Sequence, residues 1–593
     1  MKAVAAICIC LLLAIAPVTA RADHDIGIAM NGAPKYKAGF DHLDYVNADA
    51  PKGGDLRLSK SGTFNNLNNH IITGNNAEGL EYVNDKLMQR VWDEPFTMYG
   101  LVAESIDVAP DRSWITFHLR PEAKFHDGVP MTAEDVKYSY EMYRQYGHPV
   151  RRRVYGLISK VEILGPRDIK FTFGPGYDHE CVMILAMMPV LPKHYWETVD
   201  FSKTTLKPPL GSGPYKITSV EPGRKVVYSR VKDYWAKDLP VNKGQYNFDT
   251  ITYSYFRDDD IAFQAFRAGD YNLRREFDIT KWQTRYDFSN NSGGKVIKEE
   301  VAHQRPEWLK GLVFNTRRAI FSDRRVRQAL SLLFNDQWLN NTLYFGKMKR
   351  INSAFPNSEL AASGKPEGEE LRILEQYKKD LPPEVFGDAF QAAEGDRRDN
   401  KRKAMELLKQ AGWKYVDEKL VDTTGQAVSF EILLGDPGDE KVALEFARAL
   451  RTIGIDARVR TVDNAQFIGR LDDYDYDMVS TKWINSLSPG NEQTNYWGIK
   501  SGQTKGARNY AGIENPAIDA IADSIGRSDT RETLVARVHA LDRGLMTGYY
   551  MIPLFYLGKD LIAYNADIHR PPTIPIYGIV LESLWHEPVN KTP

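Results

Sequence analysis

The sequence has 593 residues, of which 26% are charged and 42% hydrophobic, and its formal net charge at pH 7 is −1. This balance gives no support for nucleic acid or an anionic membrane as a partner. A chain of this length is too long for one domain and predicts two or three lobes.

The first residues have the three-part pattern of a secretory signal peptide. A basic residue precedes an uncharged apolar run over residues 3–16, and residues 20–22 form an Ala-Arg-Ala cleavage pattern. The run is shorter than the roughly 20 residues that a membrane-spanning helix needs. Cys8 and Cys10 lie at the start of the run, whereas a lipid-modified cysteine would follow it. We therefore expect a signal peptide at residues 1–22 and a free exported protein.

Cleavage would also set the charge and the disulfide content of the mature chain. It removes Lys2 and Arg21 and no acidic residue, so the formal charge moves from −1 to −3. Of the three cysteines only Cys181 remains, so no internal disulfide can form. An exported protein of this kind relies on a large hydrophobic core for its stability.

Strand and helix patterns alternate along the mature chain, which predicts mixed α/β lobes. One helix is predicted to begin at Thr132, where Asp135 completes a capping box. Two polar stretches interrupt the pattern. Residues 357–400 are interpreted as a surface excursion, whereas the polar and aromatic residues of 485–511 are typical of a loop that lines a site. Strands are predicted over 55–59, 114–119 and 169–173, and two further helices over 323–334 and 401–410.

The sequence lacks the short motifs that carry most local catalytic chemistry. It contains no G-x-S-x-G, H-E-x-x-H, P-loop or C-x-x-C pattern. Residues 211–214 and 126–128 are interpreted as turns, and the acidic run 258–260 as the start of a helix. The twelve histidines are scattered, with no pair at metal-ligand spacing. We expect a binding protein without catalytic residues, metal or cofactor.

Several segments, taken in order, resemble one known family. Residues 111–120 and 125–136 resemble a hallmark of the large extracytoplasmic solute-binding proteins, which serve peptide and nickel importers of the ATP-binding cassette (ABC) type. The opening segment 39–54 resembles the Yej-type branch, which is associated with peptides and peptide-like compounds. The family segments continue at 211–215, 233–235, 265–270, 315–335, 407–413, 453–456 and 474–478, and those of the branch at 92–96, 237–242 and 486–492.

The resemblance implies an α/β fold with two lobes, the periplasmic-binding-protein fold, joined by a hinge of two crossover strands. It implies an extra subdomain on the first lobe and a ligand held in the cleft between the lobes. The lobes would close on a peptide or peptide-like compound, and the closed form would dock on the permease subunits of an ABC importer. The first lobe is expected at 23–75, 203–305 and 558–593, the subdomain at 76–202 and the second lobe at 306–557.

The resemblance also implies which residues meet the ligand, because family members bind the peptide main chain through strand edges. Trp483, Tyr496 and Trp497 are candidates for apolar walls, although each is equally explained as core or loop support. Arg508 is a candidate for a ligand carboxylate, with a surface ion pair as its other interpretation. The predicted contacts are Thr63, Phe64 and Asn65 in the loop after the first strand, Asn75, Asn76, Ala77 and Glu78 on the first-lobe edge, and Lys482, Trp483, Ile484, Asn485 and Ser486 on the second.

One position departs from the family pattern. Many oligopeptide binders carry an aspartate shortly after the strand tryptophan, where it pairs with the ligand's α-amine. Here Trp483 is followed by Ile484, Asn485 and Ser486, none of which is charged. The sequence therefore predicts tolerance of blocked or modified N-termini.

Other functions stay open at this point. The same fold could hold a murein-derived peptide, a sugar or nickel, although no histidine cluster supports nickel. An exported peptidase would return an altered ligand, and a chaperone-like protein would bind unfolded chains without lobe closure. We expect an exported, periplasmic monomer that is not an enzyme and binds no nucleic acid.

Overall fold

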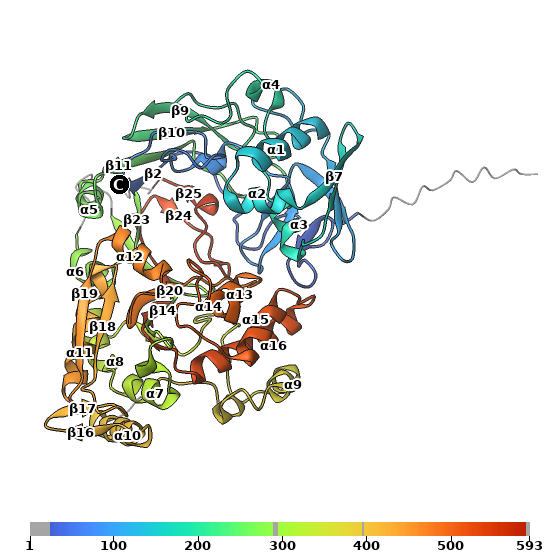
Figure 1. The fold of residues 1–593 in the computed structure, drawn as a ribbon. Coiled ribbons are helices and arrows are strands. Elements are labelled where there is room, and N and C mark those ends of the chain that lie inside the picture. The colour runs from blue at the N-terminus through green and yellow to red at the C-terminus, as the bar shows by residue number, and fades with distance from the viewer. Residues whose placement is uncertain (1–23, 289–294, 394–395, 589–593) are drawn as a thin grey trace, which may run out of the picture.

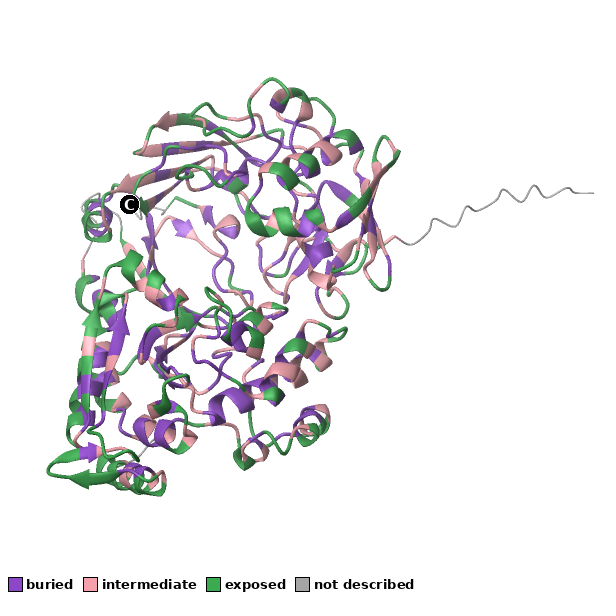
Figure 2. Ribbon diagram, viewed as in Figure 1, coloured by how far each residue is buried: buried purple, intermediate pink, exposed green. Residues whose placement is uncertain are grey.

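The computed structural model describes residues 24–288, 295–393 and 396–588, so the predicted signal peptide lies outside the described residues. Figure 1 shows two α/β lobes, the upper one mostly blue to green with the red C-terminal strands, and the lower one green to red. The chain crosses between them at residues 303–308 and again at 557–558. The predicted two-lobed α/β fold is confirmed. Figure 2 shows that buried residues fill the inside of both lobes.

Two sheets share the core of the first lobe. One has the order β2-β11-β10-β9, in which β2 and β11 are parallel, and the other has the order β12-β23-β13. Leu56, Tyr215 and Ile562, from distant parts of the chain, lie in this one core. The strands are β2 (Asp55–Ser61), β9 (Tyr215–Glu221), β10 (Lys225–Arg230), β11 (Thr250–Phe256), β12 (Leu273–Glu276), β13 (Val296–Ala302) and β23 (Lys559–Asn565), with helices α5 (Asp259–Ala268) and α6 (Ile279–Arg285) and the hairpin of β24 (Ile568–His569) and β25 (Trp585–His586).

The extra subdomain is built on a four-stranded antiparallel sheet of order β5-β6-β8-β7. Its first helix begins as predicted, because the Asp135 carboxylate accepts the Thr132 backbone N–H at 3.0 Å. Ile28 and Met30 join this core, so the start of the described chain packs with the subdomain. The elements are β1 (Gly27–Ala29), β3 (Met88–Arg90), β4 (Thr97–Gly100), β5 (Ala103–Val108), β6 (Trp114–Leu119), β7 (Ile158–Gly165), β8 (Asp168–Phe173), α1 (Ala133–Tyr146), α2 (Pro149–Gly156), α3 (His179–Ala186) and α4 (Lys193–Trp196).

The second lobe is centred on a mixed sheet of order β19-β18-β20-β14-β21. Helices cover both faces, and their apolar sides form two cores, one on each face. The strands are β14 (Leu309–Phe314), β18 (Ser429–Leu434), β19 (Asp456–Thr461), β20 (Met478–Trp483) and β21 (Met551–Pro553), with short pairs β15 (Lys349–Arg350) and β22 (Phe555–Tyr556), and β16 (Lys414–Val416) and β17 (Lys419–Val421). The helices are α7 (Arg324–Leu332), α8 (Asp336–Tyr344), α9 (Gly368–Gln376), α10 (Arg397–Gln410), α11 (Glu440–Arg451), α12 (Asn464–Asp472), α13 (Glu492–Trp497), α14 (Ile499–Gly502), α15 (Pro516–Ile525) and α16 (Arg531–Thr547).

Residues 357–400 lie largely at the surface, as predicted, but the segment is anchored in the second-lobe core at a few buried positions. Helix α9 packs on α16, and Ile373 and Leu374 are buried in the second-lobe core. The buried Arg543 guanidinium, on α16, donates to the Glu370 carboxylate and to the carbonyl oxygens of Ser363 and Gly364. A long-range ion pair therefore holds this polar segment. Among the described residues no helix combines the length and the apolar character needed to cross a membrane.

Candidate ligand-binding cleft

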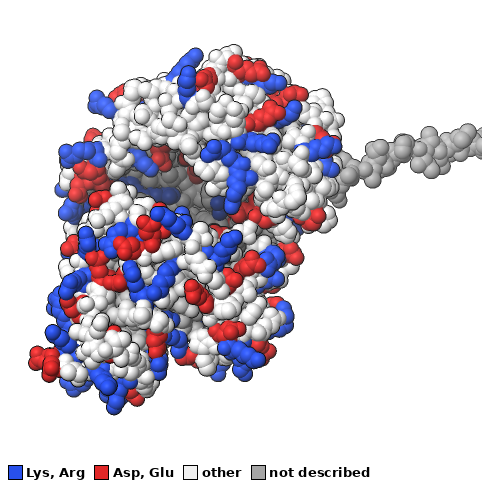
Figure 3. Space-filling model, in the orientation of Figure 1, with Lys and Arg blue, Asp and Glu red and all other residues white. Residues whose placement is uncertain are grey.

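The two crossing segments form the hinge side of the cleft and are bonded to each other. The Gly558 N–H donates to the Glu307 carboxylate at 3.0 Å, and the His303 N–H donates to the Gly558 carbonyl at 3.4 Å. Asn357 of the second lobe donates through Nδ2 to the His303 carbonyl at 2.9 Å. Figure 3 shows the hollow between the lobes. The hinge is therefore a pair of crossing segments bonded to each other rather than two independent linkers.

The lobes meet again away from the hinge. Asn491 Nδ2 of the second lobe donates to Asp178 Oδ2 of the subdomain at 2.5 Å. Burial, followed by the nearby carboxylates of Glu492 and Asp178, raises the pKa of Glu180 in this contact to about 7. The Gly32 N–H donates to a second-lobe carbonyl at 3.2 Å. In this structure the lobes therefore touch at a second place besides the hinge.

On the first lobe, the two predicted segments pair with each other. Asn66 donates to the Asn75 carbonyl at 3.1 Å and accepts from the Ala77 N–H at 2.9 Å, which makes a parallel bridge between Asn66 and Asn76. In such a bridge the N–H and C=O of Asn76 point away from Asn66. Asn65, Asn75 and Asn76 are exposed. Asn76 therefore presents an unpaired strand edge.

On the second lobe, β20 offers a similar edge at its end. Strand β18 pairs with β20 only at Met478 and Val479, whereas β14 pairs along all of it. Lys482 lies opposite Lys310 of β14, and the Lys310 carbonyl is bonded to Leu554 beyond β14, at 2.8 Å. Since opposite residues alternate between bonded and non-bonded pairs, Lys482 directs its N–H and C=O to the open edge.

The aromatic residues behind this edge are core residues. Trp483 is 1% exposed, its ring centroid lies 4.7 Å from that of Trp497, and its Nε1 donates to the Arg508 carbonyl at 3.0 Å. Trp497 is fully buried, and the buried Tyr496 donates its hydroxyl to the Ile484 carbonyl at 3.2 Å. The expectation of apolar ligand walls at these three aromatic side chains is therefore wrong. Strand alternation instead exposes their neighbours Lys482 and Ile484.

Two further predicted contacts are occupied by the fold. Phe64 is 2% exposed and packs in the first-lobe core, with its ring 4.8 Å from that of Tyr255. Asn485 is buried, donates to the Ala354 carbonyl at 2.7 Å and accepts from Gln493 at 3.0 Å. Neither side chain has an open face for a ligand, so the prediction that Phe64 and Asn485 contact the ligand is wrong. Thr63 and Ser486 are exposed, and Glu78 pairs with Lys60 at 2.8 Å.

The second-lobe side also carries two cations. Lys482 Nζ lies 3.4 Å from the centroid of the Trp308 ring, and burial together with the nearby Lys310 lowers the pKa of Lys482. Arg508 is exposed and lies 6.0 Å from the Tyr496 ring. In the described part of the chain neither forms an ion pair with a carboxylate, so the surface ion pair considered for Arg508 does not form. The two cations suit a ligand that carries negative charge.

Sequence reasoning missed Trp308. It is 50% exposed and belongs to the first crossing segment, where it contacts Lys482 of the second-lobe edge. Its position just before β14 gave no periodic signal, because a residue in a hinge belongs to neither a helix nor a strand pattern. An aromatic residue between a proline and a strand was the available cue.

Two lobes of this kind, joined by two crossing segments and each carrying an open backbone edge, define a two-lobed ligand-binding protein. The chain matches the bacterial extracellular solute-binding proteins, family 5, over residues 97–505, and it belongs to that family. The resemblance seen in the sequence is confirmed. The family is one of binding proteins rather than enzymes.

Relatives and a solved structure agree with this membership. The chain is 41% identical over 573 residues to the probable peptide-binding protein YejA of Agrobacterium fabrum, covering 94% of this chain and 93% of the relative. It is 36% identical over 580 residues to the peptidoglycan-binding protein YepA of the same organism, covering 94% of each. The oligopeptide-binding protein AppA from Bacillus subtilis, solved with a nonapeptide, matches with a TM-score of 0.62 at 20% identity, covering 91% of this chain and all of AppA.

Proposed function

We propose that this protein is the periplasmic substrate-binding component of an ABC importer and captures peptides or peptide-like compounds between its lobes. The observation that carries the proposal is the pair of open strand edges at Asn76 and Lys482, one on each lobe. An extended peptide main chain has the donors and acceptors that such edges lack. The names of the relatives support the same ligand class.

Capture would work by stabilising the closed arrangement. A ligand that bonds to both edges gains contacts in the closed form that the open form lacks, so it shifts the population toward closure. The closed form then docks on the membrane permease subunits. Export through a signal peptide at residues 1–22, a free monomeric state and the lobe boundaries near residues 305 and 557 belong to this proposal.

The charges at the cleft suggest how the ligand is oriented. Arg508 and Lys482 would attract a C-terminal carboxylate or an acidic side chain. At the other terminus, Ser486 is the exposed polar residue after the strand tryptophan, because Asn485 is buried. Without an aspartate at this point, free and blocked N-termini should bind with similar affinity.

The direct test is binding of a ligand panel to stripped protein. The mature chain would be partly unfolded to release co-purified ligand, refolded and titrated by calorimetry with short peptides, their N-acetylated forms, sugars and nickel. The proposal expects saturable binding of peptides, which mass spectrometry recovers uncleaved. Binding of only sugar or nickel would overturn the ligand class, and recovery of cleaved peptide would indicate an enzyme.

Murein-derived peptides are a second candidate ligand. Two exposed cations, Lys482 and Arg508, favour a ligand with more than one carboxylate, and a relative is named as peptidoglycan-binding. Titration with a murein tripeptide beside a neutral tripeptide of the same length separates the two. At least tenfold tighter binding of the murein compound would select it, whereas equal affinities would favour general peptide capture.

A further inference from the structure

The subdomain holds a cluster of two histidines and a carboxylate that plays no part in the cleft. Asp107 lies on β5 and His118 on β6, adjacent strands of one sheet. His24 precedes this sheet in the chain, and it is held there because Asp25 exchanges backbone hydrogen bonds with Ile106 at 3.1 and 2.8 Å. Backbone pairing thus fixes all three residues.

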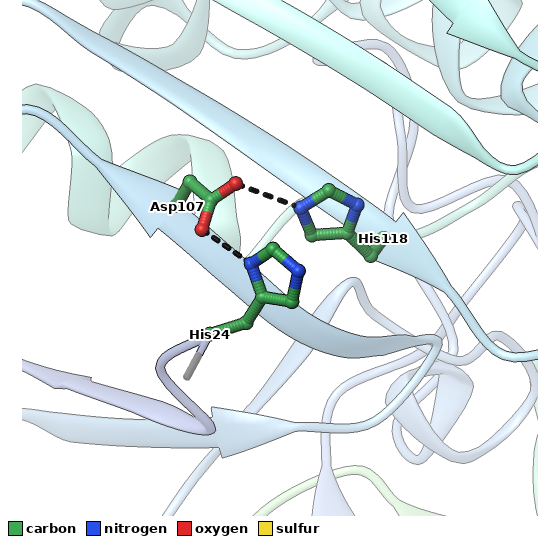
Figure 4. A group of neighbouring side chains, drawn as sticks. All are labelled: His24, Asp107 and His118. Atoms are coloured by element: carbon green, nitrogen blue, oxygen red, sulfur yellow. Dashed lines mark hydrogen bonds and ion pairs between the residues drawn. The ribbon is translucent and has the colours of Figure 1, made fainter. Parts of the chain in front are cut away.

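The two imidazole rings converge on the one carboxylate. His24 Nδ1 lies 2.6 Å from Asp107 Oδ1, and His118 Nε2 lies 3.0 Å from Asp107 Oδ2. Figure 4 shows both rings directed at Asp107, next to each other on one side of the carboxylate. One ligand atom from each residue lies within 4.8 Å of the other two. Ligand atoms around a tetrahedral zinc ion lie about 3.4 Å apart, so side-chain shifts of about 1 Å would complete the geometry.

A fourth residue supports His118 from behind. Asp168 of β8 lies directly opposite His118 in the sheet, and its Oδ1 lies 2.7 Å from His118 Nδ1. A carboxylate bonded to the second ring nitrogen of a histidine fixes the ring and its tautomer, which leaves Nε2 to face a metal. His194 has one carboxylate neighbour instead, Asp127 at 2.8 Å. The arrangement at His118 therefore exceeds what a surface ion pair needs.

We propose that His24, Asp107 and His118 bind a divalent transition-metal ion, with Asp168 as the positioning residue of His118. Two imidazole nitrogens and one carboxylate oxygen suit Zn²⁺, Ni²⁺ or Cu²⁺ rather than Ca²⁺ or Mg²⁺. The side chains are 25–38% exposed, so an ion can reach them. The sheet lies at the right-hand edge of the upper lobe in Figure 1, away from the hollow. Because one ligand precedes β1, the metal would fasten the N-terminal segment to the subdomain.

The absence of a metal-binding pattern in the sequence does not conflict with this site. His24, Asp107 and His118 are separated by 83 and 11 residues, and they meet only because β5 pairs with β6 and Asp25 pairs with Ile106. A spacing rule can find ligands on one helix or one loop, but not ligands assembled across a sheet. The earlier expectation of no metal rested on such rules.

The test is zinc titration of the untagged mature chain after dialysis against a chelator. Calorimetry should find one zinc ion per chain, with affinity reduced at least tenfold in His24→Ala, Asp107→Asn and His118→Ala. Asp168→Asn should weaken binding about 10- to 100-fold, while His194→Ala, the matched surface histidine, should bind as the parent does. The melting temperature should rise with zinc in the parent and not in His118→Ala.

Two results would overturn the site. Titration without a one-to-one zinc step would show that the cluster is an ion-pair network only. Zinc binding that persists in both His24→Ala and His118→Ala would place the ion elsewhere. Because the variants lie outside the cleft, their peptide affinity should be unchanged, and this separates the metal site from the ligand site.

Discussion

The two sides of the cleft present similar backbone edges through different means. On the first lobe, asparagine side chains hold the edge: Asn65 Oδ1 accepts from the Asn75 N–H at 2.7 Å, and Asn66 Nδ2 donates to Asn76 Oδ1 at 2.9 Å. On the second lobe, buried tryptophans hold it from behind. The difference shows that polar loops and aromatic cores can serve one purpose, which is to fix a strand edge that has no neighbour.

Residues that hold the second-lobe edge in place differ from residues that can touch the ligand. Trp483 and Trp497 are buried and position the second edge, whereas Lys482 and Ile484 are exposed beside it. Substitutions of the buried residues should therefore lower stability, and substitutions of the exposed residues should lower affinity.

Trp483→Ala should destabilise the second lobe strongly. Removal of a fully buried tryptophan costs about 3–5 kcal/mol, and it also takes away a ring that packs against Trp497. Denaturant unfolding of ligand-free protein would measure the loss. Ile484→Ala, which changes an adjacent side chain that is 54% exposed, should stay within about 0.5 kcal/mol of the parent. Unchanged stability with lost peptide affinity in Trp483→Ala would instead make Trp483 a ligand contact.

Arg508→Ala should weaken binding of peptides with a free C-terminal carboxylate. A hydrogen bond to a charged group contributes about 1.5–3 kcal/mol, which corresponds to roughly a 10- to 100-fold loss of affinity. A C-terminally amidated peptide should bind parent and variant alike. Lys505→Ala is the matched control, because Lys505 is a nearby exposed cation already paired with Asp473 at 2.5 Å. Equal losses for acid and amide would show that Arg508 does not meet the carboxylate.

N-methylation of the ligand main chain should reveal the two strand edges. Each methyl group that replaces a bonded N–H removes one neutral hydrogen bond, worth about 0.5–1.5 kcal/mol. A scan along one peptide should find positions where affinity falls about two- to twelvefold, separated by positions where it does not change. Calorimetry of the scanned series measures this pattern. A flat series would argue that side chains, rather than backbone edges, hold the ligand.

Peptide affinity should weaken modestly as pH rises from 5 to 8. Burial, Glu492 of the second lobe and Asp178 of the subdomain raise the pKa of Glu180 to about 7, against an opposing effect of Arg153. An acid with a raised pKa in the closed form stabilises closure below its open-form pKa, and this stabilisation is lost as pH passes through 7. Only the part of the shift that the second lobe causes is lost on opening, so the effect is a few-fold.

Glu180→Gln is the control for this pH dependence. It keeps the size and hydrogen-bonding capacity of the side chain and cannot ionise. The variant should hold its affinity between pH 5 and 8, apart from titration of the peptide itself. The same decline in the variant as in the parent would place the pH dependence in another group.

Local patterns predicted the elements but not their long-range partners. Alternating hydrophobicity and helix capping depend only on residues close in the sequence. For this reason the sequence predicted strands β2, β6 and β8 and the start of α1. The buried pair of Arg543 and Glu370 joins positions far apart in the chain, so residues 357–400 looked like a solvated excursion. The charge composition of a segment does not show that one of its carboxylates pairs with a buried arginine on another helix.

The candidate site was predicted in outline and missed in detail. The family resemblance led to the segments around Asn76 and Lys482, and the structure gives each an open backbone edge. The resemblance could not show which side chains face outward. The composition of residues 485–511 fits a loop that lines a site and equally fits a loop that packs into the core. The hinge residue Trp308 and the contact at Glu180 depend on how the lobes come together, which no local pattern records.

The central claim is that a peptide closes the two lobes on itself, and the distance between them tests it most directly. Spin labels at Ser202→Cys on the subdomain and Gln503→Cys on the second lobe are both at exposed positions, and the native Cys181 is buried. Pulsed electron paramagnetic resonance on stripped protein should show a broad interlobe distance that becomes shorter and narrower with saturating peptide. A distance distribution that bound peptide leaves unchanged would contradict capture by closure.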